Sequence, residues 1–282
     1  MSHAVPDEVD KAHDICALPL VRRIAATLDL DPDAIRTGDP LPRGWHVALF
    51  TAPTRQSELR PDGVGSLGVT LPDLGLPRLM AGGKRTRFSG DIVIGQTVRR
   101  RSLITAVHPK EGRSGRFVLV TMRHEITCGT GPEPVLVEEQ DYVMREAVAD
   151  AAPAAAAAVP SAMSPRGARH AREVVPDEAL LFRYCAITFN AHRIHYDRPF
   201  AVGPEGYPAL LVNGGLPVLM LLELYRAAGG RPLASVTSRN IGPLFCGRPM
   251  RLCAEPADGS WRLWAEDDVG RTCIEVSVEP AG

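Results

Sequence analysis

A ten-residue segment, residues 188–197 (TFNAHRIHYD), gathers side chains that can do acid–base chemistry. Two imidazoles, from His192 and His195, stand beside the amide of Asn190 and the carboxylate of Asp197. A histidine can take and return a proton near neutral pH, whereas an amide can orient a water molecule but cannot accept its proton. The segment therefore offers an imidazole as a candidate general base, while Asn190 could align water but could not be the base.

The spacing of these residues favours a loop. Asn190 and His195 are five positions apart, and a strand would point residues of odd separation to opposite faces of a sheet. A loop or an irregular turn can direct both side chains into one pocket. Two interpretations stay open for His192, which could line that pocket or pack beside it. Asp197 could also serve only to close the loop through hydrogen bonds.

An apolar helix is predicted shortly after this loop. Residues 216–224 (LPVLMLLEL) leave almost no polar face, so other elements must enclose the helix. Asn213, Gly214 and Gly215 stand at its expected start. Unpaired backbone N–H groups and the positive end of the helix dipole favour an oxygen that gains negative charge at such a place.

Long β-rich runs predict the sheet that would enclose this helix, in an α+β arrangement with two loosely repeated halves. A helix is expected over residues 14–30, followed by a stretch rich in proline and glycine up to residue 87. The strands expected are residues 96–109, 116–128 and 135–146 in the first half, and 233–241, 249–255, 260–266 and 271–278 in the second.

The first of these strands has a predicted inner face and a charged stretch. Val98, Ser102, Ile104 and Ala106 are expected to share one face. The three arginines at 99–101 are interpreted as a solvated part of the strand, and phosphate binding is their alternative role.

The chain divides into two predicted units around a linker. Residues 148–170 are rich in alanine and proline, and such composition is typical of a connecting segment. The expected domains are therefore residues 1–147, which shape the substrate pocket, and residues 171–282, which carry the catalytic motif.

Composition excludes several classes of function. Lys and Arg total 32 against 33 Asp and Glu, a net charge of −1, so nothing favours nucleic acid or an anionic membrane surface. The longest apolar stretch, residues 210–225, is too short and too interrupted to cross a bilayer. No signal segment is visible, so a cytoplasmic location is expected.

The sequence also lacks the patterns of a metal or nucleotide site. The six cysteines form no CxxC pair, and the two motif histidines lack a third ligand at the usual spacing. We therefore expect no metal and no nucleotide cofactor.

The motif TFNAHRIHYD, followed by GYPALLVNGGL, resembles the MaoC-like double hot-dog branch of hydratases and dehydratases. This branch comprises 3-hydroxyacyl-thioester dehydratases of type 2, mesaconyl-C4-CoA hydratases and itaconyl-CoA hydratases. The flanking segments MAGGKRTRF, EEQDYVMRE and IGPLFCGRPMRL are similar to the same branch. The resemblance implies a tandem (double) hot-dog fold, in which antiparallel sheets each wrap a central helix, and a homodimer.

The resemblance also implies roles for single residues. His195 corresponds to the histidine that moves the proton, alone or sharing it with Asp197. Asn190 stands where the wider superfamily has an aspartate, and it would align the water. The backbone N–H of Gly214 would polarise the thioester carbonyl. The implied substrate-binding residues are His192, Arg193, Asn213 and Gly215.

The implied reaction is reversible addition of water to an α,β-unsaturated acyl-CoA with a branched C4–C5 dicarboxylic acyl group, such as mesaconyl-CoA or itaconyl-CoA. A cation should then pair with the distal carboxylate, and Arg193 and Arg183 are candidates by nearness in sequence.

Three alternatives remain open at this stage. A 3-hydroxyacyl-carrier-protein dehydratase of fatty acid or polyketide synthesis would take an acyl carrier protein as partner. An acyl-CoA thioesterase would use a carboxylate on the central helix, where Glu223 is the acid available. A non-catalytic thioester-binding module would be consistent with Asn190 at the aspartate position.

Overall fold

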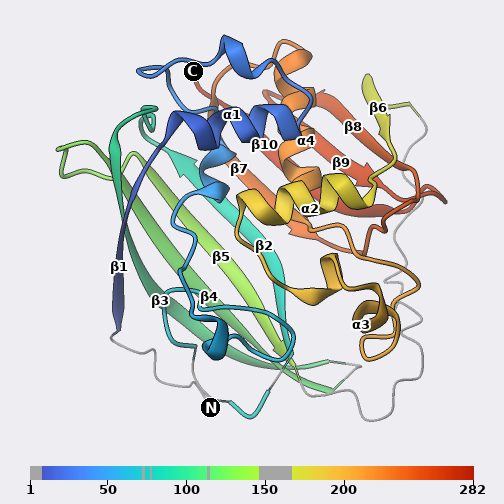
Figure 1. The fold of residues 1–282 in the computed structure, drawn as a ribbon. Coiled ribbons are helices and arrows are strands. Elements are labelled where there is room, and N and C mark those ends of the chain that lie inside the picture. Colours follow the sequence, from blue (N-terminus) through green and yellow to red (C-terminus); the bar gives the residue numbers. More distant parts are fainter. Residues whose placement is uncertain (1–7, 72–73, 77, 113–114, 146–166) are drawn as a thin grey trace.

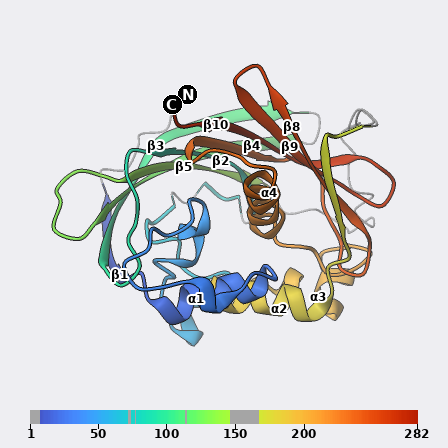
Figure 2. The same ribbon diagram turned by 90° about the horizontal axis from the view of Figure 1, so that it is seen from above.

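One curved antiparallel sheet dominates the molecule, and the helices lie on its concave side (Figures 1 and 2). The computed structural model describes residues 8–71, 74–76, 78–112, 115–145 and 167–282. The strands are β1 (Val9–Ile15), β2 (Arg78–Phe88), β3 (Thr97–Gly112), β4 (Gly115–Cys128), β5 (Leu136–Arg145), β6 (His170–Val174), β7 (Leu233–Asn240), β8 (Met250–Ala257), β9 (Ser260–Glu266) and β10 (Thr272–Pro280). The α-helices are α1 (Leu18–Thr27), α2 (Glu178–Ile187), α3 (Arg198–Val202) and α4 (Gly215–Ala227), and the 3-10 turns are η1 (Pro32–Ala34), η2 (Trp45–Ala48), η3 (Gln56–Glu58) and η4 (Arg193–His195).

The two halves of the sheet repeat one topology. The strand order is β1-β3-β4-β5-β2-β7-β10-β9-β8-β6. Read from its outer edge, the second half runs β6-β8-β9-β10-β7, which matches β1-β3-β4-β5-β2 position by position. The halves join where β2 pairs antiparallel with β7, with Lys84 opposite Ser238 and Thr86 opposite Val236. The expected α+β fold with two tandem units is confirmed, and the meander of three long strands forms as β3, β4 and β5.

Helix α4 lies inside the second half, as its sequence predicts. The helix packs against strands β8, β9 and β10, and the sheet curves around it (Figure 2). The residues buried along it are Leu216, Pro217, Leu219, Met220, Leu221, Leu222 and Tyr225.

The first half differs from the expectation of one central helix in each unit. Between α1 and β2 it has only the short turns η1, η2 and η3 within the described residues. The prolines and glycines of residues 31–87 account for this, because proline removes a helical hydrogen bond and glycine weakens a helix. Trp45 of η2 approaches α4 instead, and its indole donates a 2.8 Å hydrogen bond to Glu223. The concave side of the first half is therefore free to hold a pocket.

Smaller expectations also change. Residues 14–15 belong to β1, so the first helix is shorter than predicted. A bulge after Ile104 breaks the register of β3 with β4, and Val107 rather than Ala106 enters the core, because a bulge reverses the alternation of faces. Arg100 is largely buried, with its side chain 14% exposed, so the arginines at 99–101 are not uniformly solvated.

Two further features concern the chain as a whole. The predicted linker falls mostly on residues 146–166, which lie outside the described residues, and its last residue, His170, begins β6. Across the described residues, no helix has the length and apolarity that crossing a membrane would require.

Candidate active site

The end of α2 places the first residue of the motif. Asn190 donates its backbone N–H to the carbonyl of Cys185 at 2.8 Å, and Phe189 donates to Ala186 at 3.4 Å. This pair of bonds is the Schellman arrangement that closes many helices. Phe189 has a φ of 49°, a left-handed conformation that is costly for a large side chain. The turn fixes the backbone of Asn190 at the pocket.

Asn190 then shapes the loop that carries the histidines. Its Oδ1 accepts the backbone N–H of His192 at 2.9 Å, which is an Asx turn. The turn η4 follows, and Leu211 donates its N–H to the carbonyl of Ile194 at 3.0 Å. The loop is thereby tied to the segment that leads into α4, so the motif and the helix start lie side by side.

His195 is held as a neutral base. Its Nδ1 lies 2.9 Å from the carbonyl oxygen of Leu211, and because a carbonyl only accepts, the proton is on Nδ1 and Nε2 keeps its lone pair. Burial lowers the pKa of His195 to about 4, against the opposing effect of the Leu211 carbonyl. The ring is 7% exposed, and its Nε2 faces the amide nitrogen of Asn213 at 3.4 Å.

The start of α4 offers one unused backbone donor. Oδ1 of Asn213 accepts the N–H of Gly215 at 3.0 Å, and the carbonyl of Asn213 accepts the N–H of Leu216 at 2.9 Å. Within the described part of the chain, the N–H of Gly214 donates to no group. This donor lies at the positive end of the helix dipole, so it is available to an oxygen that gains negative charge.

A cavity of about 400 Å³ brings the predicted residues together. Asn190, His192, Asn213, Gly214 and Gly215 all line it. His195 is not among the lining residues and lies directly behind two that are: its ring meets the ring of His192 edge to face at 5.5 Å, and its Nε2 faces Asn213. Burial also lowers the pKa of His192. The cavity wall therefore carries the helix start and His192, with His195 directly behind them.

The arginines predicted to meet the substrate lie elsewhere. Arg193 does not line the cavity, because its guanidinium donates to Asp197 at 2.8 and 2.9 Å and lies 4.1 Å from the ring centre of Phe200. Asp197 also caps α3, accepting the N–H of Phe200, and so it is not a free base. Arg183 is exposed on α2. Arg193 and Asp197 hold the loop in shape.

A loop of the first half, residues 61–63, contacts the loop that carries the motif. The backbone N–H of Arg193 donates to the carbonyl of Asp62 at 2.8 Å, and its guanidinium reaches the carbonyl of Pro61 at 3.2 Å. Gly63 has a φ of +85°, and a Cβ there would lie 2.0 Å from the carbonyl oxygen of Ala191. Only glycine fits this approach of two backbones.

We expect Gly63→Ala to lower the free energy of unfolding by about 2 kcal/mol or more, because backbone strain adds to a clash with the carbonyl of Ala191. The displaced loop should also lower the activity of the site, because it carries the motif residues. Gly38→Ala is the matched control, since Gly38 has a φ of +94° and nothing within 4 Å of its would-be Cβ. Urea unfolding of both variants measures the difference, and equal losses would contradict the clash.

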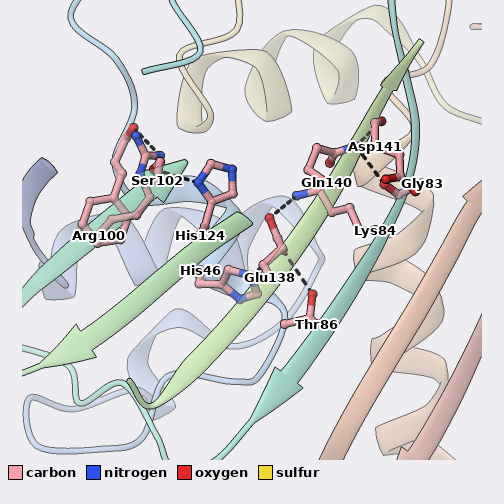
Figure 3. A network of polar contacts seen from close by, with 11 residues as sticks. His46, Gly83, Lys84, Thr86, Arg100, Ser102, His124, Glu138, Gln140 and Asp141 are labelled. Atoms are coloured by element: carbon pink, nitrogen blue, oxygen red, sulfur yellow. Dashed lines mark hydrogen bonds and ion pairs between the residues drawn. The ribbon is translucent and has the colours of Figure 1, made fainter. Parts of the chain in front are cut away.

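Sequence reasoning missed a polar cluster that the first half contributes to the same cavity (Figure 3). Glu138 of β5 accepts hydrogen bonds from His46 at 3.0 Å, Lys84 at 3.0 Å and Thr86 at 3.2 Å. Burial alone would raise the pKa of Glu138, but Lys84 and His46 bring that pKa well below its usual value. The one signal in the sequence is Glu138 at an inward position of an alternating strand.

Fold and site together define the class of protein. Paired hot-dog units, in which one encloses a helix whose first residues line a cavity and leave a free N–H near a neutral histidine, fit a thioester hydro-lyase, whose enolate oxygen needs such a donor. Residues 44–246 match the model of a protein family described as "Hydroxyacyl-thioester dehydratase type 2". This chain belongs to that family.

Individual relatives agree with this assignment. The chain is 40% identical over 276 residues, covering 95% of this chain and 94% of the relative, to a mesaconyl-C(4)-CoA hydratase of Chloroflexus aurantiacus. It has the fold of a MaoC-like dehydratase from Phytophthora capsici, with a TM-score of 0.69, 13% identity and coverage of 98% and 96%. A Mycobacterium tuberculosis protein described as a double hot-dog gives a TM-score of 0.58, 16% identity and coverage of 96% and 94%. The chain is a hydratase or dehydratase of acyl thioesters.

Proposed function

We propose that this enzyme adds water reversibly to a short, branched α,β-unsaturated acyl-CoA with a second carboxylate, of the mesaconyl-CoA or itaconyl-CoA type. The observation that carries the proposal is a cavity wall in which Gly214, with its unclaimed N–H, lines the cavity and the neutral His195 lies directly behind Asn213. The mesaconyl-C(4)-CoA hydratase relative supports the choice of substrate, because it is similar to this chain over nearly its whole length.

In the proposed reaction, Nε2 of His195 takes a proton from water, and the hydroxyl adds to Cβ of the double bond. The electron pair of the double bond moves toward the thioester oxygen, where the N–H of Gly214 stabilises the enolate. The imidazolium then returns its proton to Cα, so water is consumed and the base is regenerated. Asn190 and Asn213 orient the water, and His192 and Gly215 complete the wall against the substrate.

The thioesterase alternative needs a carboxylate on the central helix that is free to activate water. Glu223 is engaged by the indole of Trp45 and by the guanidinium of Arg226, so it is not free to activate water at the carbonyl. A homodimer, and a carrier-protein thioester as the alternative to CoA, remain predictions of the family resemblance, and a cytoplasmic location remains a prediction from the sequence.

The test is a substrate panel followed by the loss of enoyl-thioester absorbance, with free thiol measured in parallel. We expect mesaconyl-CoA or itaconyl-CoA to be hydrated, crotonyl-CoA to be hydrated more slowly, and a long-chain enoyl-CoA to be a poor substrate. Thiol release without hydration would contradict the proposal in favour of a thioesterase. Hydration only of carrier-protein thioesters would contradict the choice of CoA.

A further inference from the structure

A second cavity of about 270 Å³ lies against the first. The two share a wall that includes His46, Lys84 and Glu138. The second cavity extends over the strands of the first half, where Arg100 of β3 and His124 of β4 also line it (Figure 3). Nothing in the proposed proton transfer uses this space.

The lining of the second cavity carries an excess of positive charge. Lys84 and Arg100 supply two basic side chains, and Glu138 is the carboxylate that lines it among the described residues. Burial lowers the pKa of His124 to about 4, so that ring is neutral at pH 7. Asp10 contacts Arg100 at 3.4 Å but does not line the cavity, so the described part of the lining has two basic side chains against one carboxylate and favours a further anion.

Arg100 has hydrogen-bonding capacity to spare. Its contacts with Asp10 and with the carbonyl of Phe50 are long, at 3.4 and 3.5 Å. Its Nε is buried and has no partner. A buried donor without an acceptor is costly, so the present contacts leave the hydrogen-bonding capacity of the guanidinium incompletely used. A ligand with a charged end therefore suits this cavity better than an alkyl chain.

The register of the sheet places Lys84 near the thioester position. Lys84 lies opposite Ser238, which stands two residues before Asn240 on the same face of β7, about 7 Å along the strand. Asn240 touches the helix start, since a Cβ on Gly214 would lie 2.8 Å from its Oδ1. The two carboxyl carbons of a four-carbon diacid are about 4 Å apart, and the long side chain of Lys84 can span the remainder.

We propose that Lys84, with Arg100 behind it, binds the free carboxylate at the distal end of a short unsaturated acyl thioester. Lys84 donates to Glu138 with one N–H and can offer its other two to the substrate. The first half thus selects dicarboxylic acyl groups, a role that Arg193 and Arg183 cannot fill from their positions. The inference rests on the proposed hydration reaction.

The test compares kcat/KM for mesaconyl-CoA with kcat/KM for crotonyl-CoA, which lacks the distal carboxylate. We expect the ratio of the two to favour mesaconyl-CoA in the wild type. Lys84→Met should lower this ratio about 10- to 100-fold, mainly through KM, because a charge-assisted hydrogen bond is lost. Arg87→Met, which removes an exposed cation from the same strand, should leave the ratio unchanged.

A second pair of variants guards against loss of folding. Removing Lys84 alone leaves Glu138 with less compensation, so the double variant Lys84→Gln/Glu138→Gln removes both charges of the pair and should lower the same ratio. Arg100→Met should lower it as well. The ratio of kcat/KM for mesaconyl-CoA to that for crotonyl-CoA decides the outcome. If this ratio is unchanged in folded Lys84 variants, the inference is overturned. It is also overturned if the wild type hydrates crotonyl-CoA at least as well as mesaconyl-CoA, whereas a wild type that hydrates neither would overturn the proposed function itself.

Discussion

Replacing His195 with glutamine is expected to lower kcat for hydration by about a hundred- to ten-thousandfold, the usual contribution of a positioned general base. Glutamine keeps a donor for the carbonyl of Leu211 and nearly fills the space of the ring, so the loop should keep its shape. An amide cannot take a proton from water, and so the chemical step should fail while thioester binding persists. Measuring kcat and KM on the best hydrated thioester separates these two effects.

Two other histidine variants make this result specific. His108→Gln changes an exposed imidazole on β3 and should have no effect. His192→Gln changes the neighbouring ring in the cavity wall and should lower kcat far less than His195→Gln. A larger loss from His192→Gln would transfer the role of base to His192, which lines the cavity directly.

The pH dependence of the wild-type enzyme should reflect the same histidine. Because burial lowers the pKa of His195 to about 4 in the folded protein, the wild-type kcat/KM should fall on the acid side near pH 4 rather than near pH 6.5. The unfolded chain binds this proton at about pH 6.5, so stability from the neutral ring is full above that pH and is lost as pH falls toward 4. The loss is about 3 kcal/mol, and His195→Gln should remove it from the pH profile of urea unfolding.

Gly214→Pro is expected to lower kcat by about a hundredfold or more, because it deletes the backbone N–H assigned to the enolate oxygen. The backbone tolerates the change, since Gly214 has a φ of −58° and proline fixes φ near −65°. Gly214→Ala is the matched variant: it introduces the same Cβ beside the side-chain end of Asn240 but retains the N–H.

The comparison of these two variants isolates one hydrogen bond. Gly214→Ala should lose little activity, since the amide of Asn240 can turn aside. Equal losses for alanine and proline, at equal thermal stability, would show that the added Cβ rather than the missing N–H is responsible. The N–H of Gly214 would then have no role in stabilising the enolate.

Local sequence patterns predicted much of the fold. The nearly continuous apolar run of α4 and the alternation of polar and apolar residues along β3, β4 and β5 are patterns among neighbours in the chain. They can therefore be recognised without a structure. The bulge after Ile104 arises from pairing with β4, which no local pattern reports. Across its described residues the first half has no long central helix, and the only sign of this in the sequence is that residues 31–87 show no helical pattern.

The site divides in the same way. Asn190, His195 and Gly214 were predicted because the residues that position them are close in sequence. Lys84 and Glu138 are 54 positions apart, and they meet only because β2 and β5 are adjacent strands. Arg193 was misjudged as a substrate contact for a related reason, since nearness in sequence did not reveal that Asp197 already holds its charge.

The pairing of β2 with β7 sets how the cavity depends on protein concentration. Residues of both halves line the cavity, and the strands that join these halves belong to one polypeptide. Bringing the two halves together is thus a unimolecular step, and dilution does not separate them as it would separate two subunits. The wall that carries the motif and the wall that carries Lys84 and Glu138 therefore come together when a single chain folds.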